Sequence, residues 1–196
     1  MDSLRKDVSG ARETEPIQPV DDDVVEATLP HLPCLVADMV RLQRLTGARP
    51  GEIILLRPAD VDRKRDVWRY VPSEHKTEHH GHRRNIFIGP KAQIILLPYL
   101  LRDAEEFCFR PAESERKRRQ TRHEARTTPL NCGNRPGTTS RRTVCPTGTR
   151  YTNDSYRRAI ARACEGAFKT TARLRAKVAG NRVLVVVAFG SVGRHR

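Results

Sequence analysis

The chain has 196 residues, about the length of one domain, and no run of apolar residues long enough to span a membrane. It carries 37 Lys and Arg against 23 Asp and Glu, a formal net charge of +14. The charge is uneven: residues 1–106 hold 16 basic and 18 acidic side chains, whereas residues 107–196 hold 21 and 5. Because neutralising phosphates releases condensed counterions, the basic half predicts a polyanionic partner.

Residues 1–30 are polar and acidic and include the run Asp21, Asp22 and Asp23. This composition predicts a flexible leader. The leader also lacks the apolar stretch of a signal peptide, which favours a cytoplasmic location. The five cysteines contain no Cys-x-x-Cys pair, which argues against a disulfide framework and a zinc site; they are Cys34, Cys108, Cys132, Cys145 and Cys164.

Two helices are predicted next. Apolar residues recur at helical spacing from Leu35 to Leu45, and Gly47 follows as a natural end of that helix. Pro50 suits the first turn of a second, short helix, whose buried side consists of residues 53–56.

Two β-branched and aromatic segments, Val67–Val71 and Asn85–Ile88, predict strands. The polar, histidine-rich residues 72–84 between them are typical of a long hairpin tip. Pro90 then begins a predicted helix, Lys91–Leu101, and we expect four of its residues to face the core: Ile94, Ile95, Leu97 and Leu101.

Residues 110–150 contain many prolines and glycines and are predicted to be a basic insert, in loops or disordered. Their densest charge is the run of Arg116, Lys117, Arg118 and Arg119, which is either a solvated charge patch or, in a protein that faces DNA, a set of contacts to backbone phosphates. Helical periodicity returns over Tyr151–Phe168. Residues 169–196 form an atypical basic tail, and the abrupt change of character after Phe168 favours a reading-frame change or a gene truncation.

The most informative block runs from Leu42 to Pro90. A helix ends in Thr-Gly-Ala-Arg at Arg49, an acidic residue follows at Glu52, and a Leu-x-x-x-Asp segment leads to the strands. The hairpin between the strands carries Lys-Thr from Lys76, then an arginine and an apolar strand near a proline. This order resembles the first half of the catalytic domain of tyrosine recombinases, the phage-integrase family. The resemblance covers residues 30–110 well and Tyr151–Phe168 loosely.

The resemblance implies a role for each of three residues. Arg49 matches the first catalytic arginine of the family, which clamps the scissile phosphate. Glu52 matches the acidic residue that supports this arginine. Lys76 matches the hairpin lysine, a general acid toward the leaving 5′ oxygen.

The rest of the family's catalytic set has no evident counterpart. The family requires a His/Lys-x-x-Arg box followed by a tyrosine nucleophile, and no tyrosine lies beyond Tyr156. His123 and Arg126 fit His-x-x-Arg ahead of Tyr156, but prolines and glycines interrupt the intervening segment. We therefore expect an enzyme that is incomplete on its own.

The histidines of the hairpin tip, His75, His79, His80 and His82, have no cysteine or carboxylate cluster beside them. We therefore expect no metal and no cofactor.

The sequence thus predicts an α+β fold, mainly helical with a small antiparallel sheet. It divides into a leader at 1–30, a partial integrase-like catalytic domain at 31–168 and the tail at 169–196. The expected partners are double-stranded DNA and further recombinase protomers, in DNA integration and recombination. Three functions stay open: a recombinase completed by a tyrosine supplied in trans, a DNA-binding remnant without catalysis, and an unrelated basic protein that binds RNA or ribosomes.

Overall fold

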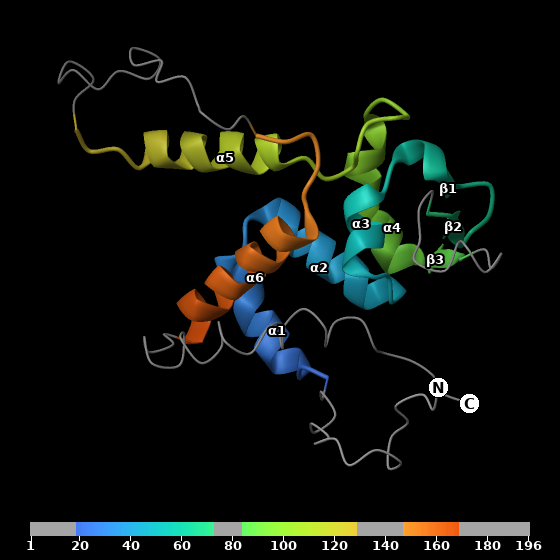
Figure 1. The fold of residues 1–196 in the computed structure, drawn as a ribbon, viewed down its shortest axis with the longest axis horizontal. Coiled ribbons are helices and arrows are strands. Elements are labelled where there is room, and N and C mark those ends of the chain that lie inside the picture. Colours follow the sequence, from blue (N-terminus) through green and yellow to red (C-terminus); the bar gives the residue numbers. More distant parts are fainter. Residues whose placement is uncertain (1–18, 73–83, 129–146, 169–196) are drawn as a thin grey trace, which may run out of the picture.

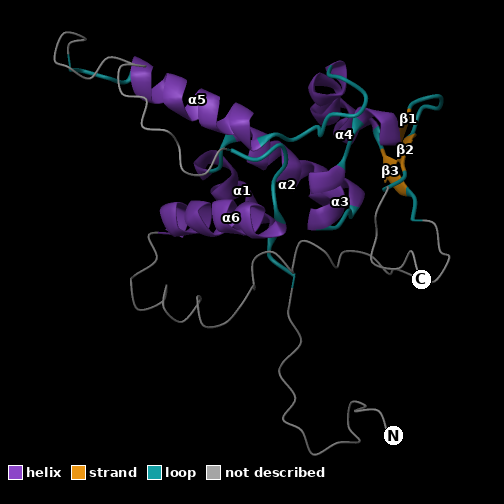
Figure 2. Ribbon diagram, turned by 45° about the horizontal axis from the view of Figure 1, so that its top comes forward, coloured by secondary structure: helices purple, strands orange, loops and turns teal. Residues whose placement is uncertain are grey.

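The computed structural model describes residues 19–72, 84–128 and 147–168. These parts form a mainly helical α+β structure with one small antiparallel sheet, so the predicted fold class is confirmed. The helix α2 (Cys34–Thr46) lies in the middle, the sheet lies at one end, and α1 and α6 lie at the other (Figures 1 and 2).

The helix α1 (Asp22–Thr28) lies within the predicted flexible leader, 1–30, and the 3-10 turn η1 (Leu29–His31) begins in it. The prediction is therefore wrong for these residues, while residues 1–18 lie outside the described parts. Val25, Leu29 and Leu32 are spaced so that all three are buried in the core, and α1 packs on α6. The neighbouring acidic side chains point to solvent. Their charge made the segment resemble a flexible leader, although the helix has an apolar side.

The helix α2 matches its prediction closely. Leu35, Val36, Met39 and Leu42 are buried along one side. Gly47 follows with a φ of 64°, which favours glycine, and its N–H donates to the Gln43 carbonyl over 2.9 Å. The glycine thus ends the helix and sets the direction of the next segment.

The helix α3 (Pro50–Leu55) follows, with Ile53 and Ile54 buried. After the turn η2 (Pro58–Asp60), the chain forms β1 (Val61–Asp62), β2 (Trp68–Tyr70) and β3 (Ile86–Ile88). The strands pair antiparallel in the order β1-β2-β3, with Tyr70 opposite Val61 and Ile86. Both predicted strands are confirmed, and residues 73–83 of the hairpin lie outside the described residues.

The helix α4 (Pro90–Leu96) continues into the 3-10 segment η4 (Leu97–Leu101). The predicted core face is largely wrong: Ile94 is 75% exposed, Leu101 is 83% exposed and Leu97 is also exposed, whereas Ile95 is partly buried. The buried residues are Ala92, Leu96 and Leu100, and α4 packs on α2. Because apolar residues occupy all sides of this segment, periodicity could not identify the side that packs.

The helix α5 (Pro111–Glu124) contradicts the predicted loop or disorder at the start of the 110–150 insert. Its residues are mostly Glu, Arg, Lys and Gln, which are strong helix formers, and proline suits its first position. None of its residues is buried. Residues 129–146 lie outside the described parts, so the prediction is corrected for α5 alone.

The helix α6 (Asn153–Phe168) confirms the helix predicted from Tyr151 to Phe168. Tyr156, Ile160 and Ala163 are buried against α1 and α3. The tail at 169–196, with its apolar run, lies outside the described residues.

Candidate functional site

Glu52 is a buried carboxylate at the start of α3. Its side chain is 5% exposed, and its Oε2 accepts the Arg49 backbone N–H over 2.6 Å. This bond satisfies an N–H that would otherwise lack a partner at the helix start. The Tyr70 hydroxyl donates to the Glu52 carbonyl over 2.7 Å, so β2 also fixes the residue. The fold therefore holds one negative charge at a defined place in the core.

Two arginines meet at the other oxygen of this carboxylate. Arg84 Nε lies 2.5 Å from Glu52 Oε1, and Arg49 Nη1 lies 4.0 Å from the same atom. Arg84 Nη2 also donates to the Gly47 carbonyl over 3.4 Å. The side chains of Arg49 and Arg84 are 48% and 32% exposed. The cluster of Arg49, Glu52 and Arg84 thus has two guanidinium groups, one carboxylate and an open side.

Arg49 and Glu52 were expected from the sequence as a pair, whereas Arg84 was not among the expected site residues. An arginine between the hairpin lysine and the apolar strand was part of the family pattern, and Arg84 occupies that place just before β3. Its pairing with Glu52 depends on the packing of the sheet beside α3, which no local pattern shows. Lys76 lies outside the described residues.

The second concentration of positive charge is α5. Salt bridges fix its first turn, because Arg102 Nη1 and Arg110 Nε both lie 2.9 Å from Glu113 Oε1. The Tyr151 hydroxyl donates to Ser114 Oγ over 2.9 Å. The four residues singled out in the sequence, Arg116, Lys117, Arg118 and Arg119, are all exposed on this helix.

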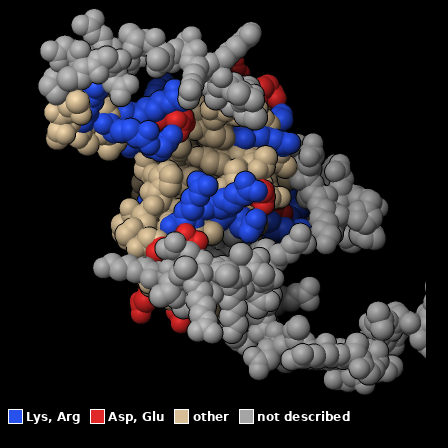
Figure 3. Space-filling model, turned by 60° about the vertical axis from the view of Figure 1, so that its left-hand side comes forward, with Lys and Arg blue, Asp and Glu red and all other residues tan. Residues whose placement is uncertain are grey.

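Charge is only partly compensated along α5. Glu115 lies 2.8 Å from both Arg118 Nε and Arg119 Nε, and their hydrogen bonds lower its pKa to about 2. Within the described residues, Arg116 and Arg122 form no ion pair. Figure 3 shows Lys and Arg side chains gathered on this face of the molecule, with few Asp and Glu among them.

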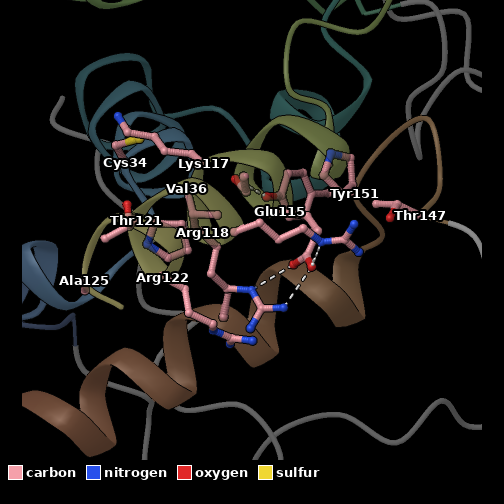
Figure 4. A pocket seen from close by; sticks show the side chains of 15 residues that line it. Cys34, Val36, Glu115, Lys117, Arg118, Thr121, Arg122, Ala125, Thr147 and Tyr151 are labelled. Carbon is pink, nitrogen blue, oxygen red and sulfur yellow. Dashed lines mark hydrogen bonds and ion pairs between the residues drawn. The ribbon is translucent and has the colours of Figure 1, made fainter. Parts of the chain in front are cut away.

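A groove of about 800 Å³ lies beneath α5 (Figure 4). Its walls include Arg118 and Arg122 from α5, Cys34 and Val36 from α2, and Tyr151. The Lys117 ammonium donates to Cys34 Sγ over 3.1 Å at its edge. The groove is therefore apolar within and basic along the α5 side.

All four tyrosines of the chain lie in the described residues, and the hydroxyl of each donates a hydrogen bond. Tyr156 is fully buried, and its hydroxyl donates to Gln43 Oε1 over 3.0 Å. Burial raises its pKa well above the ordinary value. His123 is exposed near the end of α5. The arrangement therefore does not present Tyr156 as a nucleophile beside His123 and Arg126.

In the parts of the chain that the structure describes, no three His, Cys, Asp or Glu side chains come together as metal ligands. Over the same residues, no helix has both the length and the apolar character needed to cross a membrane. The histidines of the hairpin tip lie outside these residues.

The comparisons with known proteins identify no relative. No protein-family model matches the chain, and neither a curated protein nor a solved structure matches it.

Proposed function

We propose that this protein binds double-stranded DNA through the open side of the Arg49–Glu52–Arg84 cluster and through α5, as a recombinase-like domain without its own nucleophile. The observation that carries the proposal is the half-exposed guanidinium of Arg49 above a buried carboxylate. A guanidinium that is open to solvent in this way can form two parallel hydrogen bonds to a phosphate.

The two basic regions support different parts of the proposed interaction. Arg49 lies at the start of α3, where its backbone N–H donates to Glu52 and its Nη1 lies 4.0 Å from the same carboxylate, so we expect its side chain to meet one phosphate at this place. The exposed cations of α5 are suited to phosphates of any sequence, because backbone contacts carry no base information. Binding through both regions is therefore expected to tolerate changes of sequence.

Catalysis needs a nucleophile that reaches the phosphate in line with the leaving oxygen. Each tyrosine hydroxyl of this chain is held in a hydrogen bond, and three of the four side chains are at most 7% exposed: Tyr70, Tyr151 and Tyr156. This supports DNA binding without strand cleavage by the chain alone. A tyrosine from a second protomer stays open as a way to complete the reaction.

The test is a filter-binding titration of the full chain with random-sequence duplex DNA over a series of salt concentrations. We expect log affinity to fall linearly with log salt, with a slope of about −0.9 per phosphate neutralised. Arg49→Ala should weaken binding and keep the helical circular dichroism. Affinity that does not change with salt, or helix loss in Arg49→Ala, would contradict the proposal. Tighter binding to structured RNA than to duplex DNA would favour the RNA-binding alternative.

A further inference from the structure

We propose that Arg84 is a second phosphate-binding residue, which contacts the same phosphate group as Arg49. This inference rests on the proposed function, since it concerns the ligand of that cluster. It extends the site from α3 to the sheet, because Arg84 lies just before β3 and Arg49 lies at the start of α3.

The geometry of the cluster brings its two arginines close together. Both Arg84 Nε and Arg49 Nη1 lie within 4.0 Å of Glu52 Oε1, so the two guanidinium groups are neighbours. The other carboxylate oxygen accepts the Arg49 backbone N–H, which keeps the carboxylate from turning toward either side chain. Both guanidinium groups therefore lie near the same carboxylate oxygen.

The net charge of the cluster also favours one bound anion. Two guanidinium groups and one carboxylate leave the cluster with a charge of +1, and a phosphodiester carries a single negative charge. Like charges that are held close together repel, so a bound anion between them is stabilising. A phosphodiester at the open side of the cluster would bring its charge to zero.

The two arginines also have N–H donors for hydrogen bonds to a phosphate. Arg84 Nε forms an ion pair with Glu52 Oε1, although neither atom has a hydrogen-bond partner within the described residues, and Nη2 donates to the Gly47 carbonyl over a long 3.4 Å. A guanidinium has further N–H donors, and both arginine side chains are partly exposed. N–H donors from both guanidinium groups can therefore bind the oxygens of one phosphate.

A purely structural role for Arg84, as the counter-ion of buried Glu52, predicts a different result from a phosphate contact. The slope of log affinity against log salt separates the two roles. It reports how many phosphates are neutralised, and a residue that only supports the fold does not change it. Comparing single and double variants then shows whether the two arginines share one phosphate.

The experiment compares Arg49→Gln, Arg84→Gln and the double variant, in the full chain, on random-sequence duplex DNA. Arg69→Gln is the matched control, because Arg69 lies on the adjacent strand β2, is 52% exposed and pairs with Asp62. We expect each site variant to lose roughly threefold to tenfold in affinity, whereas the control loses little. The double variant should lose about 0.9 of the salt slope in total, as for one phosphate.

The outcomes distinguish the two proposals. Arg84→Gln binding like Arg69→Gln, while Arg49→Gln weakens binding, would overturn the role of Arg84 alone. A slope loss near 1.8 in the double variant would place the arginines on separate phosphates and also overturn it. A wild-type chain that shows no salt-dependent binding would refute the proposed function itself.

Arg84→Lys guards against a folding defect in Arg84→Gln. Lysine keeps the positive charge beside Glu52 but lacks the paired N–H donors of a guanidinium. We therefore expect a wild-type thermal midpoint and salt slope, together with weaker binding. Arg84→Lys binding as tightly as the wild type would overturn the shared-phosphate geometry.

Discussion

At the scale of single residues, the site depends on Glu52. Its carboxylate satisfies the N–H of Arg49, and it lies against the guanidinium groups of both Arg49 and Arg84. A buried charge of this kind is costly unless it is paired, and removing it leaves its partners uncompensated. Glu52 is therefore expected to matter for folding and for binding together.

Replacing Glu52 with alanine should lower the free energy of unfolding by about 3 kcal/mol, because a helix cap and a buried ion pair are both lost. Urea denaturation followed by circular dichroism measures the change. Glu106→Ala is the control, since Glu106 forms an exposed salt bridge with Arg110 and should cost at most about 1 kcal/mol. Equal losses in the two variants would show that Glu52 has no special structural role.

Local sequence could predict part of this site. Arg49 and Glu52 lie three positions apart, so one motif contains both. Arg84 is 32 residues from Glu52 in the sequence and meets it only because the sheet packs beside α3. A pair of residues that are distant in the sequence can be identified only from the folded structure, even where each residue lies in a recognisable motif.

At the scale of elements, the sequence predicts a helix well where its apolar and polar residues lie on different sides. The helix α2 has a clear apolar side and a terminal glycine, and its bounds were predicted closely. The helix α5 has no buried residue, so no pattern of burial could reveal it. Ion pairs between successive turns stabilise it instead, notably those that join Glu115 to Arg118 and Arg119.

These ion pairs predict that α5 loosens in acid. The pKa of Glu115 falls from 4.5 to about 2 because of its hydrogen bonds to Arg118 and Arg119. A lowered pKa in the folded state means that the pairs stabilise the helix above pH 4.5, and that this contribution is lost as the pH falls toward 2. The amides after Glu115 should then exchange faster, relative to their intrinsic rates, by a few-fold, since such pairs contribute about 0.3–0.5 kcal/mol each.

Hydrogen exchange followed by mass spectrometry across this pH range measures the effect. In Glu115→Gln the same amides should exchange faster already near neutral pH and should show a smaller further change in acid, which then comes from the paired Glu113 of the same helix. An identical pH response in the wild type and in Glu115→Gln would assign the loosening to other groups.

At the scale of the whole molecule, exposed basic groups are present, whereas every tyrosine hydroxyl is engaged within the described structure. The Arg49–Glu52–Arg84 cluster and α5 both have cations open to solvent. All four tyrosine hydroxyls donate hydrogen bonds within the fold, and burial raises the pKa of each: Tyr70, Tyr99, Tyr151 and Tyr156. Positive charge can stabilise a developing charge at phosphorus but cannot form the phosphotyrosyl bond.

We therefore predict that the purified chain forms no covalent adduct with end-labelled duplex DNA that carries a nick to trap the intermediate. A denaturing gel separates free DNA from an adduct, and the Tyr151→Phe and Tyr156→Phe variants serve as controls. Attack by Tyr156 would require its hydroxyl to leave Gln43 and its fully buried ring to leave the core. An adduct that is lost only in Tyr156→Phe would show that this opening occurs, and it would make His123 and Arg126 candidates for catalytic residues. Absence of an adduct is the result that the structure favours, because the fold holds each tyrosine hydroxyl in its own hydrogen bond.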